Sequence, residues 1–221
     1  PQGFLQRIEH FLAIAAGRGF SSLLVLLDDC WNPGAQIGAQ LEPIPGVHNS
    51  RWLQSPGVAQ VADAAAWPRL KRYIQTIVDA FAADERVLAW DLYNEPGNSG
   101  MEDRSLPLLR AVFDWAREIQ PGQPLTAGLW NDFPTLNRYQ LSASDVISFH
   151  DYKTVDHLQA VIQKLRSENR PILCTEYMAR PLGSLFETHL PVFEEEHVGC
   201  YNWGLVAGKT LAEILWAAYE A

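Results

Sequence analysis

The sequence predicts an α/β fold of the TIM (β/α)8 type, in which a parallel sheet is closed into a barrel and covered by helices. Two observations carry this prediction. Short apolar strands alternate with amphipathic helices along the 221 residues, an order typical of a parallel sheet. Each strand also ends on polar or aromatic residues, and this is the end at which such barrels carry their active sites.

The number of strands predicts an incomplete or reduced barrel. Six strand–helix units can be recognised in the sequence, whereas a closed barrel of this type has eight. No long linker divides the chain, so residues 1–221 are expected to form a single domain.

The N-terminal region begins with a helix, a strand and a long loop. Residues 4–16 place apolar side chains at helical spacing. The continuous apolar run at 21–27 predicts a strand buried on both faces. Residues 32–57 have no period and are interrupted by proline and glycine, so they predict a loop. Three aromatic side chains along it suggest the wall of a ligand cleft: Trp31, His48 and Trp52.

The remaining elements continue the alternation of helical periodicity and short apolar runs. Pro68 opens the next helix, and Pro121 stops the one after it. The predicted elements are a helix at 68–84, a strand at 87–93, a helix at 106–119, a strand at 124–129, a short helix at 135–141, a strand at 145–149, a helix around 158–165, a strand at 171–175, a helix at 184–197 broken near Pro191, a strand at 198–202 and a terminal helix at 210–219.

Charge and composition exclude several classes of function. The formal net charge of -9 disfavours a nucleic-acid partner, because phosphates would be repelled. The longest apolar run, 23–27, is far too short for a membrane span. The three cysteines, Cys30, Cys174 and Cys200, have no metal-ligand spacing and cannot form a disulfide framework. Eight tryptophans suit an open cleft for the apolar faces of sugar rings, although core packing is the alternative for each.

Two glutamates occupy equivalent positions. Glu95 ends one predicted strand and Glu176 another, so in a barrel both would project into one pocket from opposing walls. Cleavage of a glycosidic bond requires such a pair: one carboxylic acid protonates the departing oxygen, and the other carboxylate attacks the sugar or activates water.

The strand-end residues resemble the catalytic signature of the retaining clan A glycoside hydrolases. The closest likeness is to glycoside hydrolase family 5, the cellulase family, and it extends to about Lys209. The order of the motifs matches strands three to eight of that family, which places the two missing strands at the N-terminus. The residues that carry the resemblance are Asn94-Glu95-Pro96, His150 and Tyr152, Glu176-Tyr177, and Trp203.

The resemblance implies a role for each of these residues. Glu95 would be the general acid/base, and Glu176 the nucleophile that forms a glycosyl-enzyme intermediate. The other roles implied are a hydrogen bond to the sugar 2-hydroxyl from Asn94, a stacking platform from Trp203, and orientation of the carboxylates by His150 and Tyr152. Further candidates for substrate binding, with structural roles as their alternative, are Trp31, Trp130, Tyr177 and Asp29.

The resemblance also implies a substrate class. It predicts an O-glycoside hydrolase that acts on a β-glucan, mannan or related oligo- or polysaccharide without a metal or organic cofactor. Export from the cytoplasm would suit such an enzyme, although no signal peptide is visible. The family supplies an arginine beside the nucleophile, for which the sequence has no candidate, so a raised pKa is expected for Glu176. A transglycosylase, a catalytically impaired glycan-binding protein and a segment without independent function are the alternatives.

Overall fold

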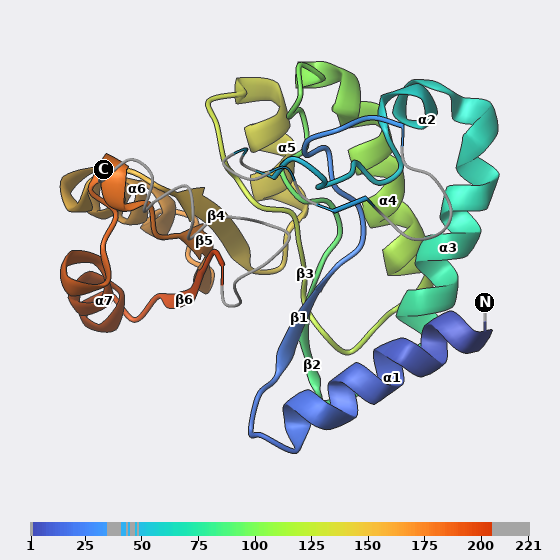
Figure 1. The fold of residues 1–221 in the computed structure, drawn as a ribbon, viewed down its shortest axis with the longest axis horizontal. Helices are drawn as coiled ribbons and strands as arrows, with labels where there is room; N and C mark the ends of the chain where they lie inside the picture. The colour runs from blue at the N-terminus through green and yellow to red at the C-terminus, as the bar shows by residue number, and fades with distance from the viewer. Residues whose placement is uncertain (1, 35–40, 43, 45–46, 48, 205–221) are drawn as a thin grey trace.

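The computed structural model describes residues 2–34, 41–42, 44, 47 and 49–204, whose strands form two parallel sheets of three (Figure 1). In each sheet the strands lie in chain order, as expected where helices connect neighbouring parallel strands. The strands are β1 (Ser22–Val25), β2 (Val87–Asp91) and β3 (Leu125–Thr126) in the first sheet, and β4 (Ile147–Asp151), β5 (Ile172–Tyr177) and β6 (Gly199–Asn202) in the second.

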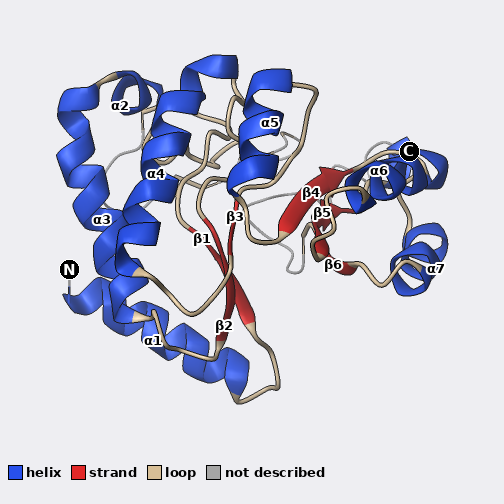
Figure 2. Cartoon of the chain, turned by 180° about the vertical axis from the view of Figure 1, so that it is seen from behind, coloured by secondary structure: helices blue, strands red, loops and turns tan. Residues whose placement is uncertain are grey.

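The helices connect the strands and pack along the outside of the two sheets (Figure 2). Their apolar stripes face the sheets, as the helical spacing of the sequence predicts. The α-helices are α1 (Gln2–Ala16), α2 (Val58–Ala62), α3 (Trp67–Ala80), α4 (Leu106–Ile119), α5 (Pro134–Ala143), α6 (Val155–Arg166) and α7 (Phe186–Glu195). Short 3-10 helices occupy Ala64–Ala66, Glu102–Ser105 and Arg180–Leu182. None of the helices within the described ranges is long and apolar enough to cross a membrane.

Each sheet has its own hydrophobic core. The first core gathers residues from α1 through α5 around Trp90, Leu92 and Phe113. The second gathers residues from β4 through β6 with α6 and α7 around Phe149 and Tyr177. The chain therefore folds as two layered halves that meet at the carboxyl ends of their strands.

Contacts on two sides join the halves. An isolated parallel bridge pairs Leu129 with Phe149 and continues the strand order from β3 to β4. On the other side, the ring of Trp52 lies 5.2 Å from that of Trp203, centroid to centroid, in an edge-on contact. Among the described residues β1 and β6 do not pair with each other, so the six predicted strands form a partial barrel.

The structure corrects two details of the predicted elements. The strand expected to be buried on both faces is an edge strand of the described sheet, and Val25 is 50% exposed on it. The helix expected to break near Pro191 runs unbroken over Phe186–Glu195. His48 and the predicted helix at 210–219 lie outside the described residues.

Candidate active site

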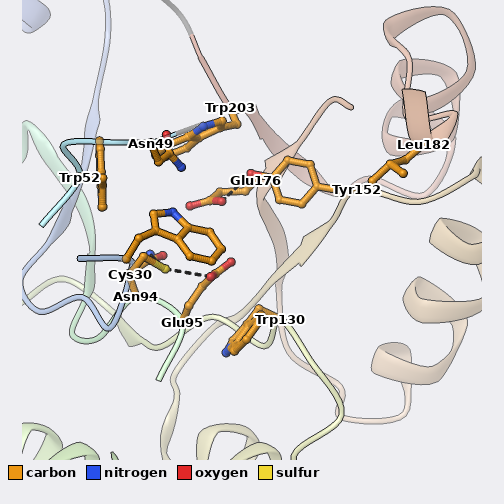
Figure 3. Close-up of a pocket in the computed structure, with 11 residues that line it drawn as sticks. Cys30, Asn49, Trp52, Asn94, Glu95, Trp130, Tyr152, Glu176, Leu182 and Trp203 are labelled. Carbon is orange, nitrogen blue, oxygen red and sulfur yellow. Dashed lines mark hydrogen bonds between the residues drawn. The ribbon is translucent and has the colours of Figure 1, made fainter. Parts of the chain in front are cut away.

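A cavity of about 270 Å³ opens where the carboxyl ends of the two sheets face each other (Figure 3). Seven of the predicted site residues line it: Trp31, Asn94, Glu95, Trp130, Tyr152, Glu176 and Trp203. Trp52 lines it too, so the described end of the loop at 32–57 contributes to the wall of the cleft. The polar strand ends of the sequence therefore do converge on one pocket.

The turn that presents Glu95 is held by Asp29. The Glu95 backbone has a φ of 43°, a left-handed conformation that non-glycine residues adopt rarely. Asp29 is 1% exposed, and its carboxylate accepts hydrogen bonds from Gly97 N at 2.8 Å, Ser105 Oγ at 2.5 Å and Tyr93 Oη at 2.6 Å. The prediction that Asp29 contacts a sugar is therefore wrong, because its oxygens are saturated by the turn beneath the pocket.

Glu95 is buried and accepts hydrogen bonds from three side chains. His150 Nδ1 lies 2.8 Å from Oε1, Cys30 Sγ donates to Oε2 over 3.0 Å, and Asn98 Nδ2 also donates to Oε2. Burial raises the pKa of this carboxyl, but the hydrogen bond and charge of His150 and the hydrogen bonds from Cys30 and Asn98 together outweigh burial, so that the pKa lies below its ordinary value.

Glu176 lies near the end of β5, opposite His150. An irregularity between Phe149 and His150 shifts the register by one residue, so that His150 rather than Asp151 is aligned with Glu176. Tyr152 Oη donates to Glu176 Oε2 over 2.6 Å, and His150 Nδ1 lies 3.5 Å from the same oxygen. Burial raises the pKa of the Glu176 carboxyl more than these partners lower it, which confirms the expected direction.

His150 carries a proton between the two glutamates. Burial lowers the pKa of its imidazole, but the charge of Glu176 and the hydrogen bond with Glu95 raise it to about 9. Asp91 adds a further negative charge from the base of the pocket, and burial raises its own pKa to about 7. The imidazole of His150 thus lies between the carboxyl groups of Glu95 and Glu176, close enough to hydrogen-bond with either.

The same three side chains could hold a metal ion. One ligand atom each from Glu95, His150 and Glu176 lies within 4.8 Å of the others. A metal would bind the neutral imidazole and release its proton. At neutral pH the raised pKa of His150 makes this release costly.

The aromatic residues divide into lining and core groups. Trp130 lines the cavity and donates from Nε1 to Pro96 O over 3.0 Å, while Trp31 lines it with 42% of its surface exposed. Tyr177, by contrast, is 2% exposed and lies in the second core, its ring stacked 6.0 Å from that of His189. The prediction that Tyr177 binds substrate is wrong, because alternation along β5 turns it toward the helices.

Sequence reasoning missed four residues at the site. Cys30, Asn49 and Leu182 line the cavity, and Asn98 donates to Glu95. Cys30 follows two aspartates at the end of a predicted strand, and this position could have marked it as a candidate site residue. Asn49 and Asn98 lie in turns and Leu182 ends a three-residue 3-10 helix, segments too short or irregular for the sequence to give the direction of a side chain.

Comparison with known proteins gives a family match over most of the chain. The model of the cellulase family, glycosyl hydrolase family 5, matches residues 39–217. Mannan endo-1,4-beta-mannosidase A of Podospora anserina is 29% identical over 119 residues, which are 54% of this chain and 27% of that protein.

Solved structures share the fold at low identity. The endo-beta-1,4-mannanase from Thermotoga petrophila aligns with a TM-score of 0.64 and 12% identity, over 90% of this chain and 52% of that one. Endo-glycoceramidase II from Rhodococcus sp., in a lactosyl-enzyme intermediate, aligns with a TM-score of 0.58 and 18% identity, over 95% of this chain and 61% of that one. The chain thus spans less than two thirds of each of these relatives.

Proposed function

Because the chain belongs to the cellulase family, glycosyl hydrolase family 5, we propose that it is a glycoside hydrolase that cleaves a β-linked glycan with retention of anomeric configuration. The observation that supports this most directly is the pair formed by Glu95 and Glu176 in one aromatic-lined cavity. Residues 1–221 are taken as one catalytic domain.

The spacing of the two carboxylates favours double displacement. An oxygen of Glu95 and one of Glu176 lie within 4.8 Å. Retaining glycosidases separate their carboxyl groups by about 5–5.5 Å, whereas inverting enzymes leave about 6.5–9.5 Å for a water molecule. The close approach of Glu95 and Glu176 is nearer to the retaining range, which supports direct attack of one carboxylate on the anomeric carbon.

The predicted catalytic and binding residues then have the following roles. Glu176 is the nucleophile and Glu95 the general acid/base. Tyr152 orients the nucleophile through its hydrogen bond, and His150 holds the acid/base. The remaining roles are a hydrogen bond from Asn94 to the sugar 2-hydroxyl and stacking of sugar faces on Trp203, Trp31 and Trp130.

The protonation of the pair sets a condition on catalysis. The first step needs a proton on Glu95 and a charge on Glu176, whereas the pKa of Glu95 is lowered and that of Glu176 raised. Two acids this close titrate as a pair that shares one proton. Catalysis needs this proton on Glu95, and that placement is less populated than the one with the proton on Glu176. Movement of His150 toward Glu176 would favour it, because the imidazolium charge would then stabilise the ionised nucleophile.

The substrate proposed is an oligo- or polysaccharide of β-linked mannose or glucose. The acidic chain and the tryptophans around the cavity suit a neutral sugar, and the Podospora relative is named as a mannan endo-1,4-beta-mannosidase. β-Mannan is therefore the first polymer to test, with β-glucan second.

Hydrolysis by matched variants tests this proposal. Wild type and Glu195→Gln, an exposed carboxyl on α7, should release sugar from β-mannan or from aryl β-glycosides, whereas Glu176→Gln should lose activity by about a thousandfold or more. NMR of the first product should show the β-anomer, and a 2-fluoro sugar should label Glu176. Equal rates for wild type and Glu176→Gln would refute the assignment. Saturable oligosaccharide binding without turnover would indicate a glycan-binding protein instead.

A further inference from the structure

Cys30 stands beside Glu95 at the wall of the cavity. Its side chain is 3% exposed and belongs to the cavity lining, and Figure 3 shows the thiol directed at the Glu95 carboxylate. The Sγ to Oε2 distance is 3.0 Å, which is short for a hydrogen bond from sulfur.

The hydrogen bonds around the sulfur fix the direction of donation. Asn98 Nδ2 lies 3.2 Å from Sγ, and an amide nitrogen can only donate. The sulfur therefore accepts from Asn98, and its own hydrogen points to Glu95. Burial, followed by the charge of Glu95, raises the pKa of the thiol above its ordinary value, so the donor hydrogen is retained at neutral pH.

The backbone before the thiol is also held in place. The amide of Cys30 donates to Asp28 Oδ1 over 2.7 Å, and Asp28 Oδ2 accepts from Trp52 Nε1 over 2.7 Å. Asn94 Nδ2 donates to Asp28 Oδ1 over 3.2 Å. The turn after β1 thus directs the thiol at Glu95 through contacts with two pocket residues.

We infer that Cys30 is a positioning residue for Glu95: its thiol hydrogen bond holds the acid/base carboxylate in place and favours the ionised form. This inference rests on the proposed function. As the proton leaves Glu95 for the departing sugar oxygen, the thiol stabilises the charge that forms on the carboxylate. The hydrogen stays on sulfur throughout, so the thiol itself neither attacks nor is oxidised.

Other groups also act on Glu95 and must stay constant in any test. His150, Glu176 and Tyr152 act on it directly, while Asp91 and Asp28 act on its neighbours His150 and Cys30. Cys30 also lowers the pKa of Asp28 through a hydrogen bond, so a change in the titration of Glu95 reports the thiol where Cys30→Ser, whose hydroxyl can donate, reverses it. Cys200, which lies on β6 and does not line the cavity, offers a matched control for loss of a thiol.

The test compares Cys30→Ala, Cys30→Ser and Cys200→Ala in the full chain. The titration of Glu95, followed by NMR of ¹³C-carboxyl-labelled glutamate with Glu95→Gln to assign the signal, is read without any substrate. Loss of one hydrogen bond to a charged group should make Glu95 about tenfold weaker as an acid in Cys30→Ala. Cys30→Ser should recover most of this effect, because its hydroxyl can donate, and Cys200→Ala should match wild type.

Kinetics give an independent readout. In Cys30→Ala the alkaline limb of kcat/KM should move to higher pH. Below that limb, where Glu95 is protonated in every variant, kcat/KM should fall several-fold more for a phenyl glycoside than for a dinitrophenyl glycoside, whose departure needs no acid. An unchanged Glu95 titration in Cys30→Ala would overturn the inference. If wild type cleaves no glycoside but the Glu95 titration shifts as described, the proposed function fails and the thiol contact stands.

Discussion

Tyr152 donates a hydrogen bond of 2.6 Å from Oη to Oε2 of Glu176. Among the partners of Glu176 it is the nearest donor, since His150 Nδ1 lies 3.5 Å from the same oxygen. Burial already raises the pKa of this carboxyl, so Tyr152 opposes the protonation that would inactivate a nucleophile.

Replacing Tyr152 by phenylalanine should therefore raise the pKa of Glu176 further. We expect kcat/KM to fall about tenfold to a hundredfold, the effect of one hydrogen bond to a charged group, and the acid limb of its pH profile to move to higher pH. Tyr201→Phe, on β6 and outside the cavity, is the control. Loss of activity with an unmoved acid limb would show that Tyr152 serves packing instead.

Asp91 predicts how stability depends on pH. Burial raises its pKa from the ordinary 3.8 to about 7 in the folded protein. The folded state therefore holds this proton more tightly than the unfolded chain, so the contribution of Asp91 to the free energy of unfolding is greatest below pH 3.8 and falls as the pH rises to about 7. Asp91→Asn removes this loss and should be more stable than wild type at pH 8, by up to about 4 kcal/mol. The advantage should vanish near pH 4 in urea titrations; a constant difference at both pH values would contradict it.

Asp29 should matter for stability more than for sugar binding. Asp29→Ala leaves three buried donors without an acceptor, which should lower the free energy of unfolding by about 3 kcal/mol or more. Because the Glu95 turn loosens, kcat should fall while KM changes less than twofold. The exposed Asp103→Ala should change neither. A large rise in KM with unchanged stability would restore the sugar-contact role.

Gly128 leaves room for the ring of His150. A β-carbon at this position would lie 3.2 Å from His150 Nε2 and 3.6 Å from Ser148 Oγ. Gly128→Ala should displace the imidazole from both glutamates and lower kcat about tenfold or more, with KM nearly unchanged. Gly122→Ala is the matched control, since its β-carbon would make only an ordinary contact of 3.5 Å with Ala82 O. Equal kcat values for the two variants would show that His150 tolerates the added methyl.

The strand ends could be predicted well, because a buried strand is an apolar run in the sequence and its end is marked by the first polar residues after that run. Glu95 and Glu176 each follow an apolar run, so their convergence could be inferred from parallel topology alone. His150 was predicted to belong with them, but its contact with Glu176 depends on a bulge between Phe149 and His150, and a single extra residue in a register has no signature in one sequence.

The errors at the site have a different cause. Asp29 and Tyr177 lie directly beside true pocket residues in the sequence, and both point away from the cavity. Tyr177 lies on β5, where neighbouring residues face opposite sides, whereas Asp29 follows the end of β1 and is turned to the donors of the Glu95 turn. Cys30 shows the converse: a residue of apolar character, usually buried as core, contacts Glu95 because the strand has already ended at Val25.

The division into two cores has a consequence for how this protein loses activity. Glu95 follows a strand of the first core and Glu176 lies on a strand of the second, so the distance between them is a measure of how the halves are docked. The half that contains β4 to β6 has the smaller core. Heating should therefore loosen this half before the half that contains β1 to β3. Turnover would then cease at the first of two transitions, while most tryptophans still report folded surroundings.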